Sequence, residues 1–349
     1  MKDLILKLEK HRFLNDEELR LLIEDESEEI LDLLNKSASD VSKKIYGNKV
    51  YIRGLIEFTN YCRNDCYYCG IRKSNCSAER YRLADAQILD CCETGYQLGF
   101  RTFVLQGGED GAFSDERIVG IIKKIKESYP DCAVTLSIGE RTHDSYKAFF
   151  DAGADRYLLR HETADTEHYS RLHPNNLSLE NRMKCLYDLK EIGYQVGCGF
   201  MVGSPYQTTE SIIKDLKFIK ELNPHMVGIG PFIPHNATPF KDFEQGELKL
   251  TLKLLSIIRL MLPNVLLPAT TARGTIDSMG REKGILAGAN VVMPNLSPKN
   301  VRKKYLLYDN KICTGDEAAE CILCMKHRMK SIGYEVAVSR GDYKEINGE

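Results

Sequence analysis

The residues with the clearest chemical potential are three cysteines, Cys62, Cys66 and Cys69, which all lie within eight consecutive residues. They follow directly after a strand-like run at 51–59. Three thiolates at this spacing, without a nearby histidine or a clear fourth cysteine, can hold three irons of a four-iron cluster and leave the fourth iron open. An open iron can bind an external ligand, so the spacing predicts a centre that carries out chemistry.

The same thiols also allow a second interpretation, a closed structural zinc site in which Cys76 supplies a fourth thiolate. Zinc sites of this kind usually pair two CxxC units, and the second candidate unit lies far away in the C-terminal tail. The spacing therefore favours an iron–sulfur cluster and leaves zinc as the alternative.

A second polar segment, 106–110, reads Gln-Gly-Gly-Glu-Asp and closes the next strand-like run. Gly107 and Gly108 allow the backbone to approach a ligand closely, and Glu109 offers an anionic acceptor. Such a sequence is also an ordinary strand-to-helix loop. Its place one strand after the cysteines favours a ligand site.

Further polar side chains stand where other strands are expected to end. They are Ser137, Arg160, Glu162, Thr270 and Thr271, with Arg182 opening a later helix. A guanidinium can bind a carboxylate in two parallel hydrogen bonds, and hydroxyls can bind ribose or small anions. The same residues could instead cap helices or face solvent.

The chain between these residues alternates strand-like and amphipathic helical runs. Strands are expected at 51–58, 101–106, 132–138, 155–160, 195–202, 225–230, 265–270 and 289–293. Several helices end on a glycine just before the next strand, at Gly99, Gly153, Gly193 and Gly288. This repeated unit predicts an α/β fold, a (β/α)8 TIM-type barrel, whose carboxyl-end face would carry the cysteines.

Three regions follow from this pattern. Residues 1–48 are expected to form a helical N-terminal extension, 49–296 the barrel, and 297–349 a C-terminal extension. Asn15 or Asp16, and then Ser27, are the expected caps of the first helices. The C-terminal extension carries a second cysteine triad, Cys313, Cys321 and Cys324, which could bind zinc, a cluster or nothing.

Composition limits the classes of partner. The 349 residues include 48 basic and 50 acidic side chains, a balance that argues against nucleic acid and anionic membranes as partners. The charged N-terminus and the interrupted apolar runs predict a cytoplasmic protein. Its twelve cysteines are then expected to be reduced, with Cys91, Cys92, Cys132, Cys185 and Cys198 as buried core thiols.

The spacing CxxxCxxC, with the aromatic Tyr68 before its last cysteine, resembles the motif of the radical S-adenosylmethionine (radical SAM) superfamily. The resemblance implies a four-iron, four-sulfur cluster held by Cys62, Cys66 and Cys69. SAM would chelate the open iron, and one electron would cleave it to methionine and a 5′-deoxyadenosyl radical. The resemblance also implies that 107–109 bind the SAM amino group.

Within that superfamily, the segments 52–69, 104–110, 154–163, 226–235, 268–272 and 292–295 resemble the HydE family of FeFe-hydrogenase maturases. The resemblance implies that Ser137 and Glu162 contact the adenosyl part of SAM and that Arg182 meets its carboxylate. The HydE family carries serine where this chain has Gly107, so no hydroxyl contact is expected there.

The same resemblance implies a substrate cavity lined by Arg160, Thr270, Thr271, Met293, Tyr305 and Tyr308. It further implies SAM, an iron carbonyl cyanide precursor, an electron donor and the companion maturases HydG and HydF as partners. The tail triad resembles an auxiliary iron–sulfur site of some HydE proteins. The alternatives are a related enzyme, such as methylornithine synthase or biotin synthase, and a non-catalytic zinc or iron–sulfur protein.

Overall fold

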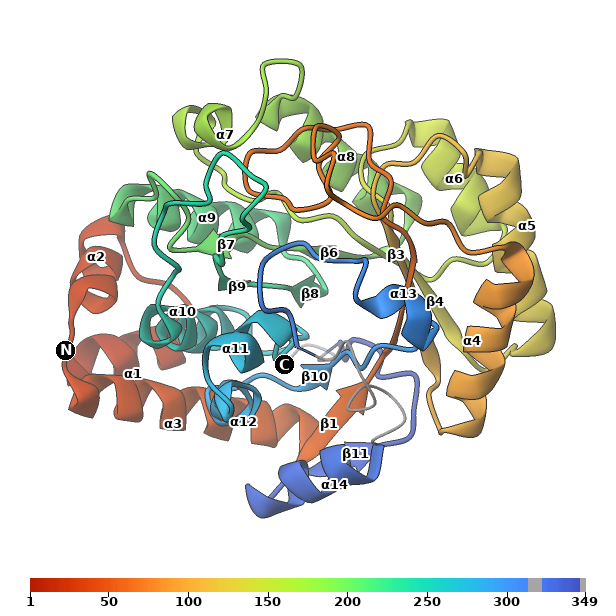
Figure 1. The fold of residues 1–349 in the computed structure, drawn as a ribbon. Helices are drawn as coiled ribbons and strands as arrows, with labels where there is room; N and C mark the ends of the chain where they lie inside the picture. Colours follow the sequence, from red (N-terminus) through yellow and green to blue (C-terminus); the bar gives the residue numbers. More distant parts are fainter. Residues whose placement is uncertain (313–321, 346–349) are drawn as a thin grey trace.

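A computed structural model describes residues 1–312 and 322–345 of the chain. The strands are β1 (Lys49–Ile52), β2 (Gly54–Thr59), β3 (Thr102–Gly107), β4 (Ala133–Ser137), β5 (Arg156–Leu158), β6 (Gln195–Cys198), β7 (Met201–Val202), β8 (Met226–Val227), β9 (Gly230–Pro231), β10 (Val291–Val292) and β11 (Glu335–Ala337). Figure 1 shows these strands in the middle of the molecule, with helices around them.

The helices are α1 (Lys2–His11), α2 (Asp16–Glu24), α3 (Glu28–Tyr46), α4 (Asp85–Gln97), α5 (Asp115–Ser128), α6 (His143–Asp151), α7 (Thr166–Leu172), α8 (Leu179–Ile192), α9 (Thr209–Leu222), α10 (Leu248–Met261), α11 (Thr271–Ile276), α12 (Gly280–Leu286), α13 (Lys299–Arg302) and α14 (Ile322–Ser331). No helix of the described residues is long and apolar enough to cross a membrane.

The strands form a closed parallel ring, as the sequence predicts. Six of them make one parallel sheet in the order β2-β3-β4-β5-β6-β8. Single parallel bridges join Met226 to Leu266 and Pro268 to Val291. β10 then pairs with β1, and Leu55 bridges to Asn295, which completes the ring. The fold is therefore a TIM-type α/β barrel.

Several of the expected strands are shorter or divided. The run 195–202 forms β6 and β7, and 225–230 forms β8 and β9. β7 and β9 pair only with each other, because the chain bends where these strands leave the main sheet. The run 265–270 forms no regular strand and joins the ring through single bridges.

The expected helix ends are confirmed. Gly99, Gly153, Gly193 and Gly288 all have positive φ, from 91° to 110°, so each turns the chain toward the following strand. At the N-terminus, Asn15 caps α2 in a capping box with Glu18, and Ser27 caps α3. The apolar faces of α1–α3 join the same core as α10 and the barrel, and Figure 1 shows α3 running along the base of the molecule.

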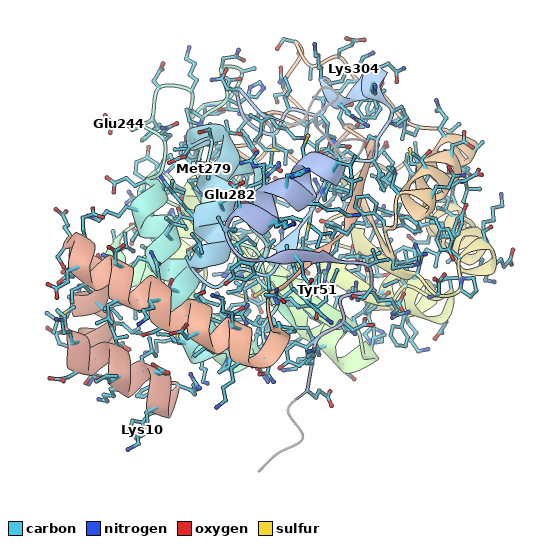
Figure 2. The ribbon with its side chains drawn as sticks, turned by 90° about the horizontal axis from the view of Figure 1, so that it is seen from below. Lys10, Tyr51, Glu244, Met279, Glu282 and Lys304 are labelled. Atoms are coloured by element: carbon cyan, nitrogen blue, oxygen red, sulfur yellow. The ribbon has the colours of Figure 1, made fainter. Side chains whose placement is uncertain are left out.

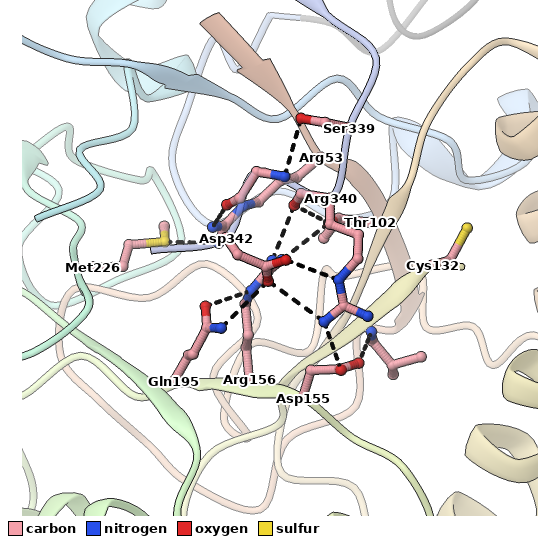
Figure 3. Close-up of polar contacts among 12 residues, drawn as sticks. Arg53, Thr102, Cys132, Asp155, Arg156, Gln195, Met226, Ser339, Arg340 and Asp342 are labelled. Carbon is pink, nitrogen blue, oxygen red and sulfur yellow. Dashed lines mark hydrogen bonds and ion pairs between the residues drawn. The ribbon is translucent and has the colours of Figure 1, made fainter. Parts of the chain in front are cut away.

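The C-terminal chain closes the amino-end of the barrel. β11 pairs in parallel with β1, and the following residues lie beneath the ring. The Arg340 carbonyl accepts hydrogen bonds from Thr102 and Arg156, and the Arg340 guanidinium pairs with Asp155 at 2.9 Å (Figure 3). Figure 2, seen from below, shows α14 beside Glu282, whose carboxylate pairs with an arginine of that helix. The division at 296 remains a prediction.

Asp342 links this C-terminal segment to the barrel and predicts a pH-dependent stability. Burial alone would raise its pKa, but bonds and charges from Arg340 and Arg156 lower the pKa from 3.8 to about 2. The carboxylate therefore stabilises the fold above its ordinary pKa, and this contribution is lost as the pH falls toward 2.

We expect Asp342→Asn to reduce the free energy of unfolding by about 1 kcal/mol near neutral pH, a value discounted for solvent screening. The discount is needed because the side chain is 38% exposed. Urea unfolding of both proteins along a pH series checks this. The difference in unfolding free energy between the two proteins should shrink as the pH falls below about 4. A difference that stays constant along the pH series would contradict the prediction.

Candidate functional site

A cavity of about 380 Å³ opens at the carboxyl ends of the barrel strands and runs into the ring. Every predicted site residue on the barrel lines it, together with two tyrosines of the chain that follows: Cys62, Cys66, Cys69, Gly107, Gly108, Glu109, Ser137, Arg160, Glu162, Arg182, Thr270, Thr271, Met293, Tyr305 and Tyr308. The fold thus brings these residues together, while their individual roles remain predictions.

The loop that carries the three cysteines follows β2 and is held by its own backbone. The Cys69 amide donates to the Cys66 carbonyl at 3.3 Å, and the Lys73 amide donates to the Asn64 carbonyl at 2.9 Å. The Arg80 guanidinium donates to four carbonyls of the same region, at 2.5–3.1 Å. One half-buried guanidinium therefore gathers the loop around the cysteines.

The three thiols are free and partly buried at the cavity wall. Burial raises the pKa of Cys62 and Cys69, and raises the pKa of Cys66 to about 12. Among the residues that the structure describes, no three His, Cys, Asp or Glu side chains converge closely enough to hold a single metal ion. Three thiolates that bind different irons of one cluster do not need to converge on one point.

The segment after β3 packs directly against this loop. A Cβ added at Gly108 would lie 2.2 Å from the Tyr61 carbonyl oxygen and 2.7 Å from the Cβ of Cys62. Glu109 faces the cavity and accepts two hydrogen bonds from Arg63, at 2.9 and 2.8 Å. The next carboxylate, Asp110, instead accepts bonds from Arg82 and Thr59, so it fixes the loop.

Three polar residues, 160–162, follow β5 and point to opposite sides of the chain. Arg160 and Glu162 line the cavity, where a guanidinium nitrogen lies 3.0 Å from a carboxylate oxygen. These two atoms are buried and lack a well-aligned hydrogen bond. His161 points the other way, 3.3 Å from the buried Asp215, and burial lowers its pKa to about 3. Glu162 has a φ of 67°, so this segment is a strained turn aimed into the cavity.

Arg182 enters the cavity wall from α8. Its Nε donates to Glu140 at 2.5 Å, and its Nη1 donates to the Arg160 carbonyl at 2.8 Å. Both partners of the ion pair are about 90% buried, since their side chains are 9% and 10% exposed. Arg182 therefore joins helix α8 to the segments that follow two neighbouring strands, β4 and β5.

We expect Arg182→Met to lower the free energy of unfolding by about 3–5 kcal/mol, because Glu140 would remain buried without its partner. Urea unfolding of the apoprotein measures this. Lys184→Met is the matched control, since Lys184 lies exposed on the same helix, where it pairs with Asp188. The free energy of unfolding of Lys184→Met should be close to that of the unchanged protein. Equal losses of this free energy in Arg182→Met and Lys184→Met would contradict the prediction.

Sequence reasoning assigned no role to several polar residues of the cavity. Glu57 of β2, Gln106 of β3 and Lys311 line it as well. A charged residue such as Glu57 inside an apolar strand is a signal that could have been used, because strand residues two apart face the same side. Lys311 has no comparable signal, since it lies in an irregular segment.

Comparison with known proteins agrees with this geometry. The sequence profile described as Radical SAM superfamily matches residues 56–219. The [FeFe] hydrogenase maturase subunit HydE of Thermotoga maritima is 41% identical, over 99% of this chain and 98% of that protein. This chain belongs to the radical SAM superfamily. It is a radical SAM enzyme, and the superfamily implies a four-iron, four-sulfur cluster and SAM as its cofactors.

Other members of the superfamily are similar over nearly the whole length. The 3-methylornithine synthase of Methanosarcina acetivorans is 30% identical, over 93% of this chain and 91% of that protein. The crystal structure of methylornithine synthase (PylB) superposes with a TM-score of 0.84 and 29% identity, covering 96% of this chain and 97% of that chain. The barrel is therefore the fold shared by these enzymes.

The residues present fit both superfamily cofactors. The three thiols that line one end of the cavity form no disulfide, and thiolates are the usual ligands of iron–sulfur clusters. Arg160 and Glu162, which also line the cavity, form an ion pair with each other at 3.0 Å, whereas the buried Arg160 Nε and Thr270 hydroxyl have no hydrogen-bond partner. Such atoms are costly in a closed protein, so they indicate a bound polar ligand. The cavity can therefore hold a cluster and an adjoining zwitterion.

The other cysteines divide into two groups. Cys91, Cys92, Cys132, Cys185 and Cys198 are all buried, which confirms their prediction as core thiols. Of the tail triad, Cys313 and Cys321 lie outside the described residues, and Cys324 lies on α14. Cys324 is disulfide-bonded, so the expectation that all twelve cysteines are reduced is wrong for this residue. The second cluster therefore remains a prediction.

Proposed function

We propose that this protein is a maturase of FeFe-hydrogenase of the HydE type, acting on a cysteine-ligated iron carbonyl cyanide precursor. The observation that carries the proposal is the 41% identity to the maturase subunit HydE, which extends over 99% of this chain. The similarity includes the barrel and the strand ends that line the cavity, so it is not limited to the cysteine motif.

In this proposal the cavity has a SAM half beside the cysteines. Cys62, Cys66 and Cys69 would hold the cluster, which would supply one electron for the cleavage of SAM to methionine and a 5′-deoxyadenosyl radical. The Gly107–Glu109 turn binds the SAM amino group in this proposal. Its Glu109 carboxylate is a charge-assisted hydrogen-bond acceptor for an ammonium group.

The other contacts to SAM come from the next strands. Arg182 faces the SAM carboxylate while Glu140 holds the guanidinium in place. Ser137 and Glu162 receive the hydroxyls of the adenosyl part. All of these side chains lie at strand ends or on helices, so they are held in place before the ligand arrives.

The substrate half lies deeper in the ring. Arg160, Thr270 and Thr271 provide a cation and hydroxyls, and the Thr270 hydroxyl is buried without a hydrogen-bond partner. These groups suit the cyanide and carboxylate groups of an anionic iron complex. Met293, Tyr305 and Tyr308 supply apolar and aromatic wall, which excludes water from a reactive carbon radical.

The proposal extends to partners. By the function of a HydE-type maturase, HydG would deliver the iron precursor, HydF would receive the product, and a separate protein would donate the electron. Cys313, Cys321 and Cys324 are proposed to hold an auxiliary cluster. Cys321→Ala should then lower the iron content of the reconstituted protein while leaving SAM cleavage in place.

The deciding experiment is maturation of apo-hydrogenase with HydF, HydG and this protein as the sole HydE component. Hydrogen production that depends on this protein and on SAM supports the proposal. The same assay records deoxyadenosine and adenosylated products. Turnover of SAM without activation of the hydrogenase would reject the maturase function and favour a methylornithine synthase type of reaction, for which the similarity of 30% over 93% of the chain is the reason.

A further inference from the structure

Residues 304–311, called here the roof strap, cross the mouth of the cavity after α13. Tyr305, Leu307, Tyr308 and Lys311 of this strap line the cavity. The strap is tied to the cysteine loop, because the Gly70 amide donates to the Leu307 carbonyl at 2.9 Å. It is also tied to the far side of the ring, where the Asp309 amide donates to the Pro234 carbonyl at 3.0 Å. The strap therefore spans the cavity from wall to wall.

A charged contact reaches from this strap into the barrel. The Lys311 ammonium donates to a Glu57 carboxylate oxygen at 2.5 Å and to the Tyr305 carbonyl at 2.9 Å. The other carboxylate oxygen of Glu57 accepts a bond from the Asn295 amide at 2.8 Å. The side chains of Glu57 and Lys311 are only 1% and 7% exposed. The pair is thus buried and satisfied inside the protein.

The pair lies on the substrate side of the cavity. Its side-chain neighbours include Asn295 and Tyr305, whose hydroxyl accepts from Gln106 at 3.4 Å. Within the part of the chain that the structure describes, the Glu57–Lys311 pair makes no hydrogen bond or ion pair to Glu109, Glu162 or Arg182. Removal of one member would leave the other as an unpaired buried charge and would release the end of the strap.

We propose that Glu57 and Lys311 are positioning residues that hold the roof strap over the substrate, and so couple the cleavage of SAM to the substrate reaction. This inference rests on the proposed function and deepens it. With the strap in place, Tyr305 and Tyr308 close the substrate half against water and stray hydrogen donors. With the strap released, the radical is quenched before it meets the substrate, and deoxyadenosine forms without product.

The test uses the full-length reconstituted protein with Lys311→Met and Glu57→Gln, where the second change keeps the size of the side chain. Hydrogen exchange measured by mass spectrometry reports on 304–311, and the ratio of deoxyadenosine to activated hydrogenase reports on coupling. Each variant should speed exchange in the strap and raise the ratio about tenfold. The affinity for SAM should stay unchanged. Lys303→Met is the matched control, because Lys303 is exposed in the adjoining turn.

The double variant Glu57→Gln/Lys311→Met separates coupling from general damage. Because the double variant removes both charges, its exchange rate in the strap and its ratio of deoxyadenosine to activated hydrogenase should be closer to those of the unchanged protein than the values of either single variant. Unchanged exchange in both single variants, equal effects from Lys303→Met, or a loss of SAM cleavage would each overturn the inference. Failure of the proposed function is distinguishable, because then the unchanged protein itself would not activate hydrogenase, whatever the strap does.

Discussion

Cys66→Ala is expected to abolish deoxyadenosine formation in the anaerobically reconstituted protein. Cys66 is the central member of the three thiols at the cavity wall, and a four-iron cluster held by only two thiolates would have a second iron without a protein ligand. The expected result is a loss of SAM cleavage to the background rate, together with a fall in bound iron and acid-labile sulfide. Liquid chromatography of the reaction and metal analysis measure both.

Cys76→Ala is the matched control for this prediction. Cys76 belongs to the same loop region, but it is exposed, and its thiol lies 3.6 Å from the Ser74 carbonyl oxygen. Its removal should leave both iron content and deoxyadenosine formation unchanged. If Cys76→Ala instead lost its metal as Cys66→Ala does, a four-thiolate site that includes Cys76 would replace the three-thiolate cluster.

The second large effect is expected from Gly108→Ala. The added methyl group would lie 2.2 Å from the Tyr61 carbonyl oxygen, so either the cysteine loop or the turn before Glu109 must move. Overpacking of this kind costs about 1–3 kcal/mol. Because the moved parts carry the proposed cluster ligands and the proposed SAM acceptor, the affinity for SAM should fall about ten- to hundredfold. Anaerobic titration calorimetry with SAM measures this loss.

Gly111→Ala provides the control in the same segment. A Cβ at Gly111 meets no atom within 4 Å, so the substitution adds a methyl group to open space. Its SAM affinity should equal that of the unchanged protein. A normal affinity in Gly108→Ala would show that the close contact with the cysteine loop is not needed for SAM binding.

The sequence alone was sufficient for features that depend on neighbouring residues. The cysteine spacing places three thiols in one loop, whatever the rest of the chain does. The glycines at helix ends also act locally, and their positive φ values match the expectation. With the alternation of strands and helices, these local signals predict a barrel and the face that carries its site.

Other features follow from pairs of residues that are distant in the sequence. Arg302 opens a run of three basic residues, 302–304, yet it is 1% exposed because its side chain turns inward and bonds to the Ser297 carbonyl. The C-terminal segment closes the base of the barrel through Arg340 and Asp342, which meet Asp155 and Arg156. No periodicity near either end of the chain predicts those contacts.

The candidate site shows the same division. Its cysteines, the Gly107–Glu109 turn and the polar strand ends can be read from the sequence, because each follows a strand of recognisable pattern. Glu57 and Lys311 are 254 residues apart, and only the closed ring brings their charges together. Short-range patterns determine which residues form each element, whereas burial and ion pairing depend on which elements meet. The tertiary structure therefore determines that the roof strap closes the cavity, whereas the sequence alone identifies the cysteines and polar strand ends that line it.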